Sequence, residues 1–168
     1  MSKRAILLLL IIILPLSAIS CSDPPEMPRT NLIISTLCDT EISLPAGKIY
    51  SSDLDPTDKN HLSDRLISAY LGEPDIEKYK KDWVSYSIFV PSGAHPCEFA
   101  VIYCSTPEAL IDTSRLLTSR IDSVKRQYGN EFQGYTDNAK VVNIGNFAIL
   151  IISSDTATAL KAVKKVCR

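Results

Sequence analysis

The sequence predicts a two-layer α+β domain, in which helices cover one face of an antiparallel sheet of about four strands. Two pairs of strand-like segments, each joined by a short connection, predict two β-hairpins. Helical patterns precede, separate and follow these pairs. The expected order is therefore helix, hairpin, long helix, hairpin, helix, and packing the helices on one sheet would bury their apolar faces.

The first part of the domain has the least regular pattern. The apolar side chains of residues 31–38 allow a short helix, whereas residues 48–56 have no regular period. Residues 57–71 predict a firmer helix, because apolar side chains recur at helical spacing and Gly72 follows as a stop signal. Residues 74–75 open one or two further helical turns.

The first hairpin and the long helix after it have clearer signals. Residues 84–90 change to a period of two, which predicts a strand, and residues 98–104 form a second, mostly apolar strand. Thr106 then offers a hydroxyl N-cap, and a proline follows at the first helical position. The apolar stripe of this helix continues to about Tyr128.

The second hairpin and the last helix complete the domain. Residues 140–144 and 147–153 flank Gly145-Asn146, a two-residue connection that is typical of tight hairpins. Ser154 or Asp155 can cap a helix over residues 156–166.

The N-terminus predicts export and lipid attachment. Residues 1–20 have a short basic start, an apolar run and small residues at a cleavage site, which is the pattern of a signal peptide. The apolar run is too short for a transmembrane helix and contains Pro15. Cys21 directly after the cleavage site predicts a diacylglyceryl cysteine on the extracytoplasmic face of the cell membrane. Simple secretion is the alternative, because Ala18 replaces the usual leucine three residues before the cysteine.

The mature chain is a single domain of nearly balanced charge. Residues 21–29 are rich in proline and predict an extended tether, which leaves residues 30–168 as a single α+β domain. The chain has 18 basic and 19 acidic residues; residues 1–20 hold two of the basic ones and none of the acidic ones, so the mature charge is −3. This balance argues against a nucleic-acid partner. The lysines near residues 78–81 and 161–165 are interpreted as solvated helix faces and ends.

The cysteines raise a question of pairing. With Cys21 assigned to lipid, an even set of possible disulfide partners or free thiols remains: Cys38, Cys97, Cys104 and Cys167. Cys97 and Cys104 lie on one predicted strand, about 23 Å apart when extended, so they cannot pair with each other. No spacing matches a zinc site, and the sequence predicts neither a metal nor a cofactor.

The landmarks of the chain follow a recognisable order. They are the lipid-type cysteine, Leu44-Pro45, Tyr70-Leu71-Gly72, residues 75–79 leading into the strand at 84–88, a long helix ending near Gln127-Tyr128, Tyr135, and the strand 148–152 before a last helix. This order resembles domain-of-unknown-function family 4358, whose members are uncharacterised lipoproteins of Gram-positive bacteria. The resemblance covers most of residues 30–166 and implies a fold and a location, but no activity and no site. The chain departs from the family by its four further cysteines and its longer helix near residues 57–71.

Two classes of function stay open, and we favour the first. It is a non-catalytic accessory or binding lipoprotein that contacts an envelope protein through an exposed face of the sheet or through the aromatic loop with Phe132 and Tyr135. The second is a small extracytoplasmic hydrolase or thiol-redox protein that uses His95 and Cys97. The sequence contains no nucleophile elbow, glycine-rich phosphate loop or zinc-protease helix, so no motif predicts a catalytic residue.

Overall fold

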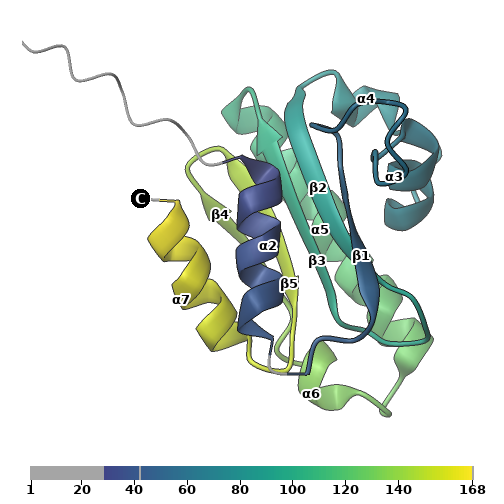
Figure 1. The fold of residues 1–168 in the computed structure, drawn as a ribbon, viewed down its shortest axis with the longest axis vertical. Helices are drawn as coiled ribbons and strands as arrows, with labels where there is room; N and C mark the ends of the chain where they lie inside the picture. Colours follow the sequence, from purple (N-terminus) through teal and green to yellow (C-terminus); the bar gives the residue numbers. More distant parts are fainter. Residues whose placement is uncertain (1–28, 42, 168) are drawn as a thin grey trace, which may run out of the picture.

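The computed structural model describes residues 29–41 and 43–167 (Figure 1). The predicted signal peptide, Cys21 and the tether up to residue 28 lie outside these residues. The strands are β1 (Gly47–Ser51), β2 (Trp83–Pro91), β3 (Glu98–Cys104), β4 (Lys140–Ile144) and β5 (Phe147–Ile152). The helices are α2 (Thr30–Thr40), α3 (Asp64–Leu71), α4 (Glu77–Lys80), α5 (Pro107–Tyr128), α6 (Gln133–Thr136) and α7 (Thr156–Val166).

The predicted α+β class is confirmed, with one more strand than expected. All neighbouring strands are antiparallel, in the order β1-β2-β3-β5-β4. The two predicted hairpins are β2–β3 and β4–β5, and they join through the central pair β3–β5. The added strand is β1, which pairs with β2 and lies in the segment that had no regular period in the sequence.

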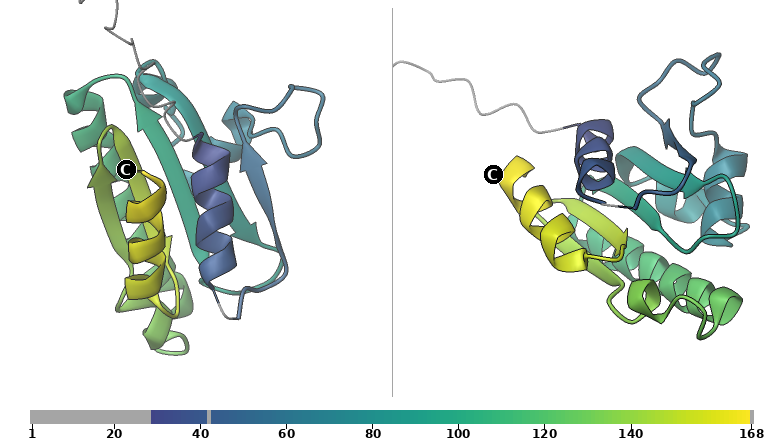
Figure 2. Two further views of the ribbon diagram at one scale, coloured as in Figure 1. Left: turned by 60° about the vertical axis from the view of Figure 1, so that its left-hand side comes forward. Right: turned by 60° about the horizontal axis from the view of Figure 1, so that its bottom comes forward.

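Helices lie on both faces of the sheet, where one covered face was expected (Figures 1 and 2). Helices α2 and α7 pack on one face, and α5 packs on the other beside α3 and α4. The physical reason is the composition of the central strands: in β3, Phe99 and Val101 face α2, whereas Ala100 and Ile102 face α5. A strand buried on both faces needs apolar side chains at consecutive positions.

Local signals account for the longest helix. The Thr106 hydroxyl accepts a hydrogen bond from the Ala109 N–H at 3.1 Å, and Pro107 occupies the first turn. The helix ends at Tyr128, and Gly129 follows with a φ of 55°. Both predicted boundaries of α5 are therefore confirmed.

The helix predicted over residues 57–71 is shorter in the structure. It begins at Asp64, after Ser63 accepts a hydrogen bond from the Leu66 N–H. Residues 57–60 form turns instead, because the Asp55 carboxylate accepts from the Thr57 N–H and the Asp58 carboxylate from the Asn60 N–H. His61 then forms an isolated bridge with Ser51.

Gly47, the first residue of β1, provides a test of how closely this strand packs. A Cβ at this position would lie 2.5 Å from the Phe89 ring and 2.7 Å from the Val90 carbonyl oxygen, which is backbone and cannot turn aside. We expect Gly47→Ala to lower the free energy of unfolding by about 1–3 kcal/mol in urea denaturation. Gly93→Ala is the control, because no heavy atom lies within 4 Å of its Cβ. Equal stability of the two variants would contradict the packing of β1.

Candidate functional site

Several segments that are distant in the sequence meet at one end of the domain, near α6 (Figure 1). They are the end of α2, the β2–β3 connection, the end of α5, α6 and the start of α7. Two groups of side chains occupy this end. We call the first the aromatic edge (His95, Tyr128, Phe132 and Tyr135) and the second the Glu41 cluster (Glu41, Ser153 and Ser154).

The aromatic edge is a set of half-buried rings that meet edge to face. The His95 ring lies 4.9 Å from Tyr135 and 5.3 Å from Phe132, and Tyr128 lies 5.6 Å from Phe132, between centroids. The Tyr128 hydroxyl also donates to the His95 carbonyl oxygen at 3.1 Å. These contacts fix the β2–β3 connection against the end of α5, so the rings form one continuous, partly exposed surface.

The Glu41 cluster holds a carboxylate with neutral donors. Glu41 is 6% exposed and directly follows α2. Its carboxylate accepts from the Ser153 hydroxyl at 2.5 Å, from the Ser154 N–H at 3.2 Å and from the Ser154 hydroxyl. No cation of the described residues pairs with it. The carboxylate lies instead where α7 begins, at the positive end of that helix.

The two groups influence each other electrostatically. Burial and then the Glu41 charge raise the pKa of the Tyr135 hydroxyl. Burial lowers the pKa of His95, and the Glu41 charge opposes that shift. The His95 Nδ1 accepts the Cys97 N–H at 3.0 Å, so the proton of the neutral ring is on Nε2. Because its pKa is lowered, the ring is neutral at pH 7.

The structure does not join His95 and Cys97 as a base and a nucleophile. The His95 Nδ1 accepts a hydrogen bond from the Cys97 backbone N–H, not from its thiol. The Cys97 side chain is fully buried among α2 and the central strands, and burial, Glu41 and Cys38 all raise the pKa of its thiol. A reactive cysteine needs an accessible thiol with a lowered pKa, and this arrangement provides the opposite.

The four cysteines of the domain are free in the structure. Cys38 and Cys97 belong to the cluster beneath α2 and α7, whereas Cys104 lies on the α5 face, where its thiol contacts Thr113. Cys167 follows α7 and is half-buried. Cys97 directly precedes β3 and Cys104 is its last residue, so they lie at opposite ends of an extended strand. This placement agrees with the prediction that they cannot pair.

We expect the native chain to show unequal thiol reactivity. Burial raises the pKa of Cys38 to about 12 and raises that of Cys97 further, so both stay protonated at pH 7. Iodoacetamide at neutral pH should modify the half-buried Cys167 first and leave Cys38 and Cys97 unmodified, as read by mass spectrometry of peptides. The same reaction in urea, where every thiol is exposed, is the control. Native alkylation of Cys97 as fast as Cys167 would contradict its burial.

The structure contains a buried ion pair, between Glu98 and Arg120, that was not predicted from the sequence. On the α5 face, the Arg120 guanidinium donates two hydrogen bonds to the Glu98 carboxylate, at 2.9 and 2.6 Å. The two side chains are 18% and 4% exposed. Arg120 also lies 4.8 Å above the Tyr70 ring, and burial raises the pKa of that tyrosine. A glutamate at the start of an apolar strand and an arginine between apolar helix positions are the signals that could have revealed this pair.

The described part of the chain contains no group of three or more His, Cys, Asp or Glu side chains that could hold a metal ion. Among its helices, none combines the length and apolar character needed to cross a membrane.

Comparison with protein-family models, curated proteins and solved structures finds no match to this chain. The resemblance to family 4358 therefore stays a prediction from the sequence landmarks.

Proposed function

We propose that this chain is a membrane-anchored lipoprotein of the cell envelope that acts as a non-catalytic binding module. In this proposal a diacylglyceryl group on Cys21 holds the chain on the extracytoplasmic face of the membrane. The aromatic edge then contacts an envelope protein. The observation that carries the proposal is the arrangement along the long axis: Thr30, which follows the tether, lies at the end of the domain opposite α6 and the aromatic edge (Figure 1).

The composition of the aromatic edge supports binding to a protein. Aromatic side chains with polar atoms provide large contact areas at low entropic cost and are enriched in the energetic centres of interfaces. Tyr128, Phe132 and Tyr135 are only half-buried. The other surface considered from the sequence, an exposed face of the sheet, has less support, because helices pack on both faces.

The alternative of a hydrolase or thiol-redox protein has less support. It needs His95 to activate the Cys97 thiol, and His95 instead accepts the backbone N–H of that residue. The His95 ring instead meets Tyr135 and Phe132 edge to face, as part of the aromatic edge.

The anchor and the binding surface are tested separately. Metabolic labelling with a palmitate analogue should mark the wild-type chain and leave Cys21→Ser unlabelled. Unlabelled, fully secreted wild-type protein would refute the anchor. For the binding surface, a photo-cross-linking amino acid at the exposed Gln133 should give a discrete protein adduct in native membranes.

The same cross-linker at the exposed Thr118, on the middle of α5, is the matched control and should give no such adduct. Phe132→Ala should remove the Gln133 adduct while thermal unfolding shows a folded domain. Identical adducts from both positions, or an adduct that persists in Phe132→Ala, would refute the aromatic edge as the contact surface.

A further inference from the structure

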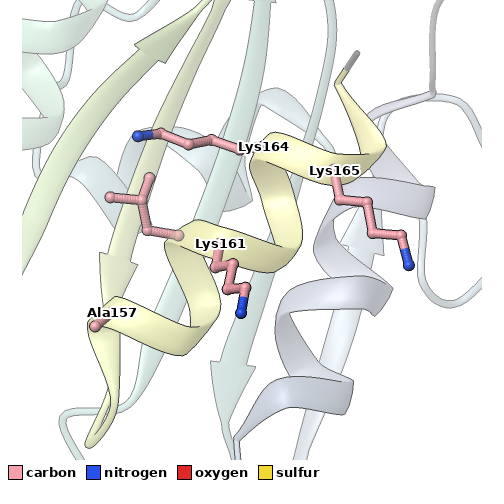
Figure 3. A pocket seen from close by; sticks show the side chains of 5 residues that line it. Ala157, Lys161, Lys164 and Lys165 are labelled. Carbon is pink, nitrogen blue, oxygen red and sulfur yellow. The ribbon is translucent and has the colours of Figure 1, made fainter.

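The outer surface of α7 carries a concentration of positive charge. Lys161, Lys164 and Lys165 are exposed and extend from the last two turns of the helix around a shallow hollow floored by Ala157 and Leu160 (Figure 3). None of the ion pairs among the described residues uses these lysines. No neighbouring carboxylate therefore compensates their charges, so this part of the protein can attract an anionic surface.

This lysine surface lies beside the point where the N-terminal tether joins the domain. Helices α2 and α7 pack side by side and run in opposite directions, so Val166 and Thr30 lie at the same end (Figures 1 and 2). Arg29 is exposed there, and Leu32 on the first turn of α2 is 54% exposed. Basic and apolar side chains thus share the end of the helical layer that the tether enters.

The length of the tether restricts the distance between this end and the anchor. Eight residues lie between Cys21 and Thr30, and the nine steps from one Cα to the next that join them span at most about 30 Å when fully extended. An anchored chain therefore keeps the end of α7 within reach of the membrane surface at all times, which favours even a weak attraction.

The opposite edge of the domain has the opposite charge. The loop after β1, at the edge strand on the far side of α2, carries Asp53, Asp55 and Asp58, all exposed. Asp53 accepts a hydrogen bond from the Thr30 hydroxyl at 3.3 Å, so this loop lies at the same end of the domain as the tether. Asp155, at the start of α7, lies away from the lysines at its end. At this end of the domain, an anionic surface would attract the side of α7 and repel the side of the acidic loop, so the charge distribution favours an orientation in which α7 faces the surface.

We infer that the last two turns of α7 dock on the anionic phospholipid headgroups of the membrane that carries the lipidated Cys21. This inference rests on the proposed lipid anchor. Each lysine near such a surface increases binding about fivefold, and Leu160 and Leu32 can enter the headgroup region beside them. The docked domain keeps the aromatic edge uncovered, because that edge lies at the other end of α7.

Lysine footprinting of the full chain tests the docking. Protein purified from membranes would be placed in vesicles of phosphatidylcholine, either alone or mixed with phosphatidylglycerol. An amine-reactive reagent would then modify the lysines, and mass spectrometry would measure the rate at each one. Lys161, Lys164 and Lys165 should react about fivefold more slowly in the anionic vesicles. Lys125 and Lys140, which are exposed elsewhere, should react equally in both. High salt should abolish the difference.

A charge-removal variant provides the second measurement. In Lys164→Gln/Lys165→Gln, Lys161 should regain its full reactivity on anionic vesicles, whereas in the matched Lys125→Gln/Lys140→Gln variant it should stay protected. Equal reactivity of the α7 lysines in both vesicle types, with lipid present on the Cys21 peptide, would refute the docking and leave the anchor intact. A Cys21 peptide without lipid would overturn the anchor itself, and with it the docking.

Discussion

Replacement of Arg120 by methionine is expected to lower the free energy of unfolding by about 3 kcal/mol, because breaking a buried ion pair leaves an uncompensated charge. The charge is that of Glu98, whose carboxylate is 4% exposed and accepts both of its side-chain hydrogen bonds from Arg120. Without the guanidinium the carboxylate must either stay ionised in an apolar environment or take up a proton. Urea denaturation of Arg120→Met against wild type measures the loss.

Two further variants show whether the loss comes from the unpaired charge. Arg115→Met is the matched control, because Arg115 lies on the same helix and its ion pair with Asp112 is exposed; it should cost within about 1 kcal/mol. Adding Glu98→Leu to Arg120→Met should recover most of the lost stability, since a buried pair can often be replaced by apolar side chains at little cost. If Arg120→Met costs no more than Arg115→Met, the pair is not buried as described.

Replacement of Glu41 by alanine is the second change for which we expect a large effect, about 2–3 kcal/mol, because hydrogen bonds to a charged acceptor contribute more than neutral ones. The carboxylate accepts three hydrogen bonds from Ser153 and Ser154 and so connects the end of α2 to the start of α7. Its loss leaves the Ser153 hydroxyl, 1% exposed, without its acceptor. Denaturation and amide hydrogen exchange at Ser154 measure the two consequences.

Asp39→Ala is the control for Glu41, because Asp39 is an exposed carboxylate in the last turn of the same helix. It should change stability by no more than about 0.5 kcal/mol. Glu41→Gln should fall between alanine and wild type, since an amide keeps one acceptor oxygen. A Glu41→Ala variant as stable as Asp39→Ala would show that the cluster contributes nothing to holding α2 against α7.

The hairpins and α5 could be predicted because their signals are local. Alternation, a two-residue turn and a capped helix start all lie within a few residues of the structure that they specify. Strand β1 could not be found in this way, because Gly47–Ser51 becomes a strand only by pairing with β2, about 40 residues later. The second covered face was readable in principle: β5 is apolar at all six positions, and all six are buried.

In the candidate site, too, local features could be predicted from the sequence and long-range contacts could not. His95, Phe132 and Tyr135 stood out as residue types in loops, and the structure brings them together. Glu41 gave no signal, because its partner Ser153 lies 112 residues away and serines are common at helix starts. The pairing of a histidine nitrogen with a backbone N–H rather than a thiol likewise depends on how the β2–β3 connection turns, which no spacing along the chain can specify.

The position of α2 has a consequence for the order of folding. A chain is synthesised from its N-terminus, yet the buried face of this helix, with Ile33, Ile34 and Leu37, rests on strands and on α7, which come later. The β2–β3 hairpin can close locally and early, whereas the packing of α2 is complete only when α7, the last element of the domain, has formed. A chain that stops before residue 156 would therefore leave the side of α2 that packs on α7 exposed, as a target for chaperones or for aggregation.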